Sequence, residues 1–140
     1  MRRRLEAHGF SDDEVRRAIG TALEAGLLDD RAFARLWVVD RVEHRPLARS
    51  AVARELREKG VPPAIAESAL AEAYPPELER KLIWRLAQER LHRLAGIEPE
   101  ARERRTIGYL TRRGFSFSEV RGIVAQEIRS QERREEATDE

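Results

Sequence analysis

The sequence contains no cysteine and no long apolar run, and each absence excludes a class of protein. Without cysteine there is no disulfide and no thiolate metal site, so we expect a cytoplasmic protein adapted to reducing conditions. No stretch approaches the roughly 20 apolar residues that a membrane-spanning helix needs. The basic segment Met1–Arg4 leads into no apolar stretch, so we expect no secretory signal.

Lysine is scarce as well, because Lys59 and Lys81 are the only two and arginine carries nearly all the positive charge. Arginine suits bidentate contacts with phosphates and carboxylates, although genomic codon bias explains the same excess equally well. The chain is 41% hydrophobic and 38% charged, with a net charge of +1. It can therefore bury a core, but its overall charge indicates no particular partner.

The sequence also lacks a recognisable catalytic or metal-binding constellation. The eight glycines form no phosphate-binding loop, and His8, His44 and His92 have no nucleophile near them in the sequence. Glu89 and His92 have the i, i+3 spacing of a carboxylate-bridged metal site, but such a site needs a second matching pair, and the sequence offers none. We therefore expect a binding protein rather than an enzyme, with no cofactor and no metal.

One short pattern occurs three times, at Leu5–Phe10, Leu56–Val61 and Leu110–Phe115. In each copy a leucine is followed by a basic or histidine side chain, a glycine and an apolar residue. Leucine packs the last turn of a helix, the basic residue suits the negative end of the helix dipole, and glycine adopts the left-handed conformation that closes a helix. Each copy therefore predicts the end of one helix and the start of another.

The residues after each copy carry helix-start signals. Ser11 and Ser116 each precede a glutamate by three positions, which is capping-box spacing, and the middle copy uses proline at 62 and 63. Apolar residues then recur at helical spacing, and no segment alternates as a strand would. These patterns predict an all-α protein of tandem three-helix repeats that form an elongated, curved array. We place the repeats at residues 1–44, 45–95 and 96–130, and a charged, disordered tail at 131–140.

The aromatic residues Phe33, Trp37 and Trp84 lie among aliphatic neighbours at helical spacing. They could stack on nucleic-acid bases, but this spacing is more typical of core packing. We expect both tryptophans to be largely buried.

Basic residues gather in three stretches, and we expect a partner or DNA to contact them. Acids are interspersed, so a solvated charged surface is the alternative, and the sequence does not show which side chains share a face. The expected contact residues are Arg45, Arg49, Arg54, Arg57, Lys59, Arg80, Lys81, Arg85, Arg102, Arg105, Arg112, Arg113 and Arg121. Arg90 and Arg93 belong to the middle stretch, and Arg104 to the last.

Four motifs in order resemble the bacterial RecX family. Gly9-Phe10 resembles the turn of its first repeat, and Leu27–Trp37 (LLDDRAFARLW) resembles its helix start Leu-x-Asp-Asp-x-x-Phe-Ala-x-x-Trp/Tyr. Glu55–Val61 (ELREKGV) and Tyr109–Ser116 (YLTRRGFS) resemble the turns of the second and third repeats. The likeness covers nearly the whole chain before the tail. One departure is that the chain begins inside the family's first helix.

The resemblance implies a monomeric regulator that lodges in the groove of the RecA filament on single-stranded DNA and lowers its ATPase, recombinase and co-protease activity in DNA repair and the SOS response. Its arginines would pair with acids of the filament, and direct weak contact with DNA is open. A stand-alone helical DNA-binding protein is the leading alternative. A helical adaptor for another partner is a third.

Overall fold

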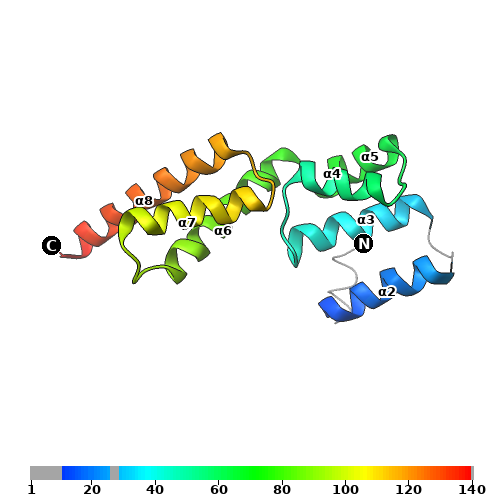
Figure 1. The fold of residues 1–140 in the computed structure, drawn as a ribbon, viewed down its shortest axis with the longest axis horizontal. Helices are drawn as coiled ribbons and strands as arrows, with labels where there is room; N and C mark the ends of the chain where they lie inside the picture. Colours follow the sequence, from blue (N-terminus) through cyan, green and yellow to red (C-terminus); the bar gives the residue numbers. More distant parts are fainter. Residues whose placement is uncertain (1–10, 26–28, 140) are drawn as a thin grey trace. The chain divides into compact units, whose positions relative to one another are not determined.

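The computed structural model describes residues 11–25 and 29–139, and seven helices account for most of this part of the chain (Figure 1). They are α2 (Asp12–Ala25), α3 (Asp30–Glu43), α4 (Arg49–Glu58), α5 (Pro63–Ala73), α6 (Pro76–Arg93), α7 (Pro99–Arg112) and α8 (Phe117–Asp139). No strand occurs among these residues, which confirms the all-α helical repeat fold. None of the described helices is long and apolar enough to cross a membrane.

The helix starts follow from local chemistry. Asp29 caps α3, because its side chain accepts a hydrogen bond from the Ala32 N–H at 2.7 Å. Ser11 accepts from the Glu14 N–H at 3.2 Å, as the capping-box spacing predicts. At α5 a proline occupies the first turn, where its missing N–H leaves no unpaired donor.

The leucine–glycine pattern ends α4 and α7 as the sequence predicts. Gly60 has a φ of 83°, its N–H donates to the Arg57 carbonyl at 3.0 Å, and the Val61 N–H donates to the Leu56 carbonyl at 3.0 Å. These two bonds define a Schellman motif, in which the residue after the glycine packs back on the helix. Gly114, with a φ of 93°, closes α7 in the same way. The first copy lies outside the described residues.

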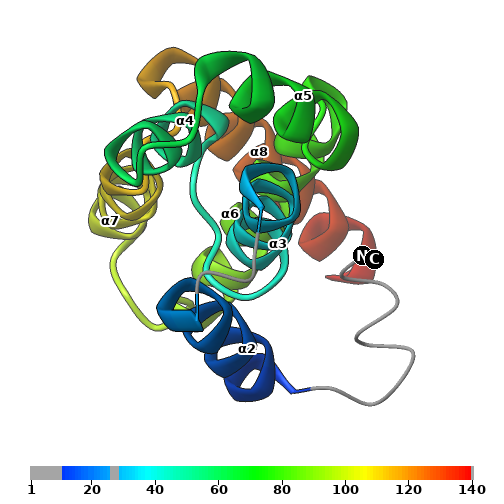
Figure 2. The same ribbon diagram turned by 90° about the vertical axis from the view of Figure 1, so that its right-hand side faces the viewer.

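The chain forms two compact units, Met1–Pro76 and Glu77–Glu140. In the first unit, α3 packs against α2, α4 and α5, and α4 also packs against α5 (Figures 1 and 2). Its most deeply buried side chains include Val15, Phe33, Val38, Val52, Leu56 and Tyr74. The Tyr74 hydroxyl donates to the Leu47 carbonyl at 2.7 Å, which fastens the end of α5 to the segment before α4.

In the second unit, α7 packs along α8, and α6 is joined to both. Gln88 of α6 donates to the Glu127 carboxylate of α8 at 3.3 Å. Arg102 of α7 donates to the Leu91 carbonyl of α6 at 2.8 Å. The core includes Ile83, Leu91, Leu110, Phe115, Val120 and Val124.

These units group the helices differently from the predicted repeats. The boundary between the units lies after Pro76, whereas the sequence places α6 in the repeat at residues 45–95. Through Gln88 and Leu91, α6 instead bonds to α7 and α8. The difference arises because the repeated pattern marks helix ends, and a helix end does not reveal which neighbours share its core.

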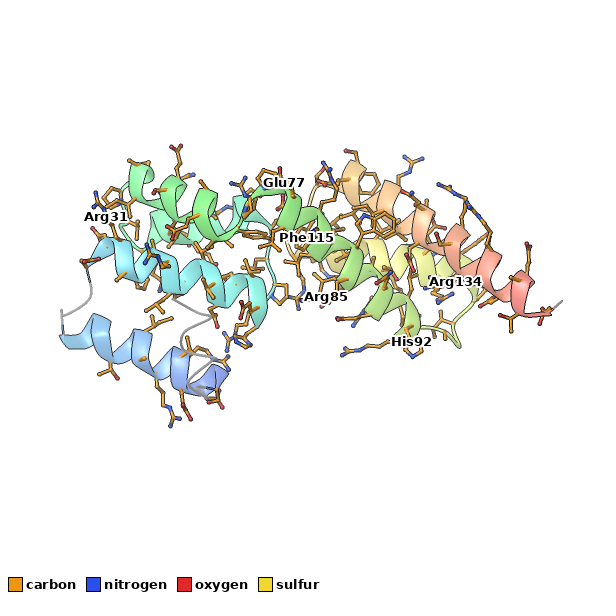
Figure 3. All side chains as sticks on the ribbon, turned by 180° about the vertical axis from the view of Figure 1, so that it is seen from behind. Arg31, Glu77, Arg85, His92, Phe115 and Arg134 are labelled. Atoms are coloured by element: carbon orange, nitrogen blue, oxygen red, sulfur yellow. The ribbon has the colours of Figure 1, made fainter. Side chains whose placement is uncertain are left out.

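The C-terminal segment also differs from its prediction. The expected disordered tail at residues 131–140 is helical through Asp139, as the continuation of α8. The segment contains neither glycine nor proline and is rich in glutamate and arginine, which favour helices. Arg134 (Figure 3) donates to the buried Glu127 carboxylate at 3.1 Å and so ties two further turns to the core.

Candidate partner-binding surfaces

Three of the predicted contact residues are partly buried and bonded within the fold. Arg49 donates through Nε to the Tyr74 carbonyl, at the end of α5. Arg102 bonds the Leu91 carbonyl and, at 3.1 Å, the Gln131 side chain. The Arg113 guanidinium lies 4.7 Å from the centre of the Tyr109 ring. Substituting these arginines would disturb packing as well as charge.

Three other predicted contact residues are exposed, and each already lies near an acidic side chain or an aromatic ring. Arg80 lies 3.6 Å from Glu119, and Arg85, which extends from α6 in Figure 3, lies 3.7 Å from Glu89. The Lys59 ammonium lies 5.2 Å from the centre of the Trp37 ring. Such exposed pairs are each worth about 0–1 kcal/mol, so a partner can replace them at little cost.

The remaining predicted residues are exposed and form no ion pair with another described residue. They are Arg45, Arg54, Arg57, Lys81, Arg105, Arg112 and Arg121. On α4, Arg54 and Arg57 are one turn apart, away from the buried Val52 and Leu56. We call Arg54 and Arg57 the α4 pair.

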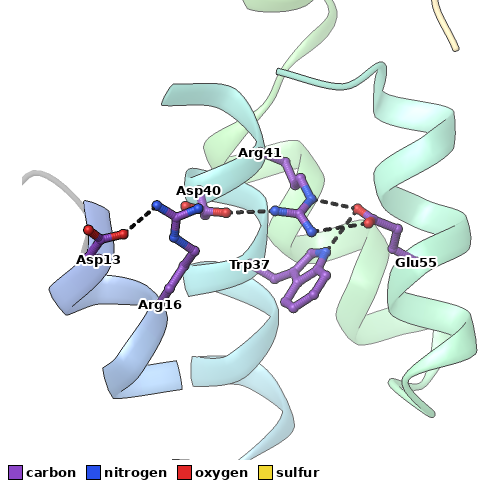
Figure 4. Close-up of polar contacts among 6 residues, drawn as sticks. All are labelled: Asp13, Arg16, Trp37, Asp40, Arg41 and Glu55. Carbon is purple, nitrogen blue, oxygen red and sulfur yellow. Dashed lines mark hydrogen bonds and ion pairs between the residues drawn. The ribbon is translucent and has the colours of Figure 1, made fainter. Parts of the chain in front are cut away.

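Trp37 belongs to a polar network that joins α3 to α4 (Figure 4). Its ring Nε1 donates to the Glu55 carboxylate at 3.1 Å, and the Arg41 guanidinium lies 4.4 Å from the ring centre. Arg41 also bonds both oxygens of Glu55, at 2.9 and 3.2 Å, and the buried Asp40 at 2.7 Å. These contacts assign a structural role to Trp37, the last residue of the helix-start motif, and to Arg41, one turn further along α3.

Trp37 and Trp84 are largely buried, as predicted, but each keeps an exposed part. The Trp37 ring packs against Phe33, with 5.5 Å between ring centres, and the Arg41 and Lys59 cations lie 4.4 and 5.2 Å from its centre. An indole at the rim of a core keeps its N–H within reach of a polar partner. Helical periodicity does not distinguish the rim of a core from its centre.

A basic surface in the second unit surrounds Tyr109 on α7. The Arg90 guanidinium lies 4.3 Å from the ring centre, and Arg90 Nε is buried without a hydrogen-bond partner among the described residues. Arg90, Arg93 and Tyr109 line one shallow depression together with Leu86 and Glu89. We call Arg90, Arg93, Arg105, Arg112 and Arg113 the Tyr109 cluster.

Helix geometry explains the α7 half of this cluster. Arg105, Arg112 and Arg113 stand four residues before, three after and four after Tyr109, so they flank it on one helix face. Glu89 is the acid that lines the same depression, and it already faces Arg85. Several guanidiniums with few opposing acids suit an anionic partner, either carboxylates or phosphates.

The sequence alone indicates only the α7 members of the Tyr109 cluster. The spacing around Tyr109 on α7 indicates a shared face, but only tertiary packing brings Arg90 and Arg93 of α6 beside it. Both arginines belong to a basic stretch but are not among the expected contact residues, and the sequence marks Tyr109 only as part of a motif.

Two family descriptions match this chain. Residues 29–70 match "RecX, second three-helix domain", and residues 77–124 match "RecX, third three-helix domain". The first set of residues holds α3, α4 and most of α5, and the second holds nearly all of α6, all of α7 and the start of α8. These divisions agree with the compact units better than the repeats predicted from the sequence do.

Similar proteins carry the name "Regulatory protein RecX". The one from Amycolatopsis mediterranei is 32% identical over 129 residues, which cover 92% of this chain and 73% of that protein. The one from Mycolicibacterium smegmatis is 35% identical over 134 residues, covering 93% and 71%. The one from Streptomyces coelicolor is 38% identical over 105 residues, covering 75% and 55%. The chain thus spans between about half and three quarters of their lengths.

Two solved structures share the fold. The crystal structure of a regulatory protein RecX aligns with a TM-score of 0.58 and 24% identity, over 86% of this chain and 60% of the other. The crystal structure of RecX from Lactobacillus salivarius aligns with a TM-score of 0.58 and 20% identity, over 88% and 79%. At these identities the likeness supports the fold alone.

Proposed function

The chain belongs to the RecX family of regulatory proteins, and from this premise we propose that it binds the RecA–DNA filament and inhibits its ATPase, recombinase and co-protease activity. It would act by binding, without catalysis of its own. The observation that supports this proposal is that each compact unit carries exposed arginines with no ion pair to a described residue. Guanidiniums of this kind are available to acids of a protein partner.

Several dispersed arginines would share the binding energy. An exposed pair contributes about 0–1 kcal/mol, so one Arg→Ala substitution should change inhibition little. Reversing the charge places like charges against each other across the interface, and this costs several kcal/mol. Charge reversal of a group is therefore the informative change.

The test measures RecA ATPase on single-stranded DNA against increasing concentrations of the chain. Two double variants avoid the arginines that are bonded within the fold: Arg54→Glu with Arg57→Glu in the α4 pair, and Arg105→Glu with Arg112→Glu in the Tyr109 cluster. The matched control reverses two exposed charges elsewhere, Arg17 and Arg31. All three variants change the net charge by the same amount, and circular dichroism checks their helicity.

We expect the wild type and the control to inhibit, and at least one of the two test variants to require a several-fold higher concentration. If the wild type leaves RecA ATPase unchanged, the proposed inhibition is wrong. If it inhibits and both test variants inhibit equally well, filament binding does not depend on these basic surfaces.

A stand-alone DNA-binding protein is the second candidate, and the Tyr109 cluster is the observation that favours it. Guanidiniums lie about 4–5 Å from the ring centre of Tyr109, so phosphates rather than stacked bases would be the ligand. Titration of DNA with RecA absent separates the two functions. Tight binding that weakens steeply with salt would support direct DNA contact through several phosphates.

A further inference from the structure

The first turn of α8 carries an exposed aromatic residue. Phe117 is 59% exposed and is the one large apolar side chain exposed among the described residues. It borders an open depression of about 380 Å³ on the surface of α8. The residues that line this depression are Phe117, Ser118, Arg121, Gly122, Ala125 and Arg129, and we call them the α8 face.

Most of the α8 face lies away from the core side of the helix. The buried residues of α8 are Val120, Ile123, Val124 and Glu127. At 100° per residue, Ala125 and Arg129 fall on the other side of the helix from that stripe, and Arg121 lies at its flank. A Cβ placed on Gly122 would meet nothing within 4 Å, so the floor of the depression is open.

We propose that the α8 face is a docking surface for an acidic helix of the partner. The inference rests on the proposed function and specifies which surface of the second unit meets RecA and what chemistry it meets. Phe117 would enter an apolar pocket of the partner. Arg121 and Arg129 would pair with carboxylates on either side of the small residues between them.

The spacing of the charges favours a helical occupant. Arg121 and Arg129 are eight residues apart, about 12 Å along the axis at 1.5 Å per residue. Neither forms an ion pair with another described residue. Gly122 and Ala125 between them allow a second helix axis to approach to about 8 Å, the short end of the usual packing range. Carboxylates two turns apart on that helix would face both guanidiniums.

A second copy of this chain is a poorer occupant. Two α8 faces packed antiparallel about Ala125 would bring Arg121 of one copy against Arg129 of the other. A parallel arrangement would oppose identical arginines. Like charges directly opposite each other across an interface cost several kcal/mol, whereas an acidic helix meets both arginines favourably.

The experiment is co-sedimentation of the full chain with RecA filaments assembled on single-stranded DNA. Three variants test separate parts of the face: Phe117→Ala removes the anchor, Arg121→Glu with Arg129→Glu reverses the charges, and Gly122→Leu fills the depression. Arg17→Glu with Arg31→Glu is the control for charge. Circular dichroism and thermal unfolding check the fold of each variant.

We expect Phe117→Ala to weaken binding about tenfold, which is the size of a modest hot-spot residue. The double charge reversal should weaken binding by about a hundredfold or more, and the control should bind as the wild type does. Gly122→Leu is the most discriminating variant. It replaces glycine inside a helix, so thermal stability should rise while binding falls.

Each contrary result has a separate meaning. A wild-type chain that does not sediment with filaments overturns both the proposed function and this docking surface. A wild-type chain that binds while all three face variants bind equally well overturns the docking surface alone. Analytical ultracentrifugation of the chain by itself tests whether a second copy occupies the α8 face. A dimer that the face variants dissociate would make the face a self-interface and overturn the proposal.

Discussion

Gly60→Ala tests whether the leucine–glycine turn stabilises the protein through backbone conformation alone. Gly60 has a φ of 83°, and a Cβ added there would meet nothing within 4 Å. The substitution therefore introduces no steric contact with the rest of the protein. What remains is the preference of an L-residue against the left-handed region, about 1–2 kcal/mol. We expect the free energy of unfolding to fall by that amount.

The matched control is Gly20→Ala in α2. Gly20 also has open space around its Cβ position, but it lies inside a helix with an ordinary φ. Alanine there should stabilise the protein by up to about 1 kcal/mol. Urea unfolding followed by circular dichroism measures both variants, and their free energies of unfolding should differ by roughly 1–3 kcal/mol. Equal stabilities for the two variants would refute the argument that the sign of φ decides the role of glycine in the repeated pattern.

Two further predictions concern polar contacts. Trp37→Phe should cost about 1 kcal/mol of unfolding free energy, because it removes the Nε1 bond to Glu55. Trp37→Ala should cost about 2–4 kcal/mol, because part of the ring is exposed. A fully stable Trp37→Ala variant that no longer binds RecA would instead make Trp37 a contact residue. Arg134→Ala should cost about 1 kcal/mol, because the buried Glu127 loses its charged partner while that partner is itself 65% exposed. Arg133→Ala is its control in the same unfolding experiment and should be nearly neutral; equal losses for the two would contradict the role of Arg134.

The helix boundaries were predictable because their causes are local. A cap such as Asp29 acts on an N–H three residues away, and the turn at Gly60 joins residues within six positions of each other. The family was predictable for the same reason, since its motifs consist largely of these caps, turns and core positions. The charged end of α8 was the exception. Its composition resembles a disordered tail, and its anchor through Arg134 depends on the burial of Glu127.

Only the tertiary structure decided which arginines are available to a partner. Arg102 and Arg105 look alike in the sequence. Arg102, however, donates to the Leu91 carbonyl of α6 and to the Gln131 side chain of α8, whereas Arg105 has no ion pair with a described residue. Likewise Phe117 has the helical spacing of the core, yet it lies at the first turn of α8 and remains exposed. Apart from the end of α8, the sequence by itself determined where the described helices start and stop, because those interactions span a few residues. Exposure depends on residues brought together from distant positions, and the packing of the helices sets it.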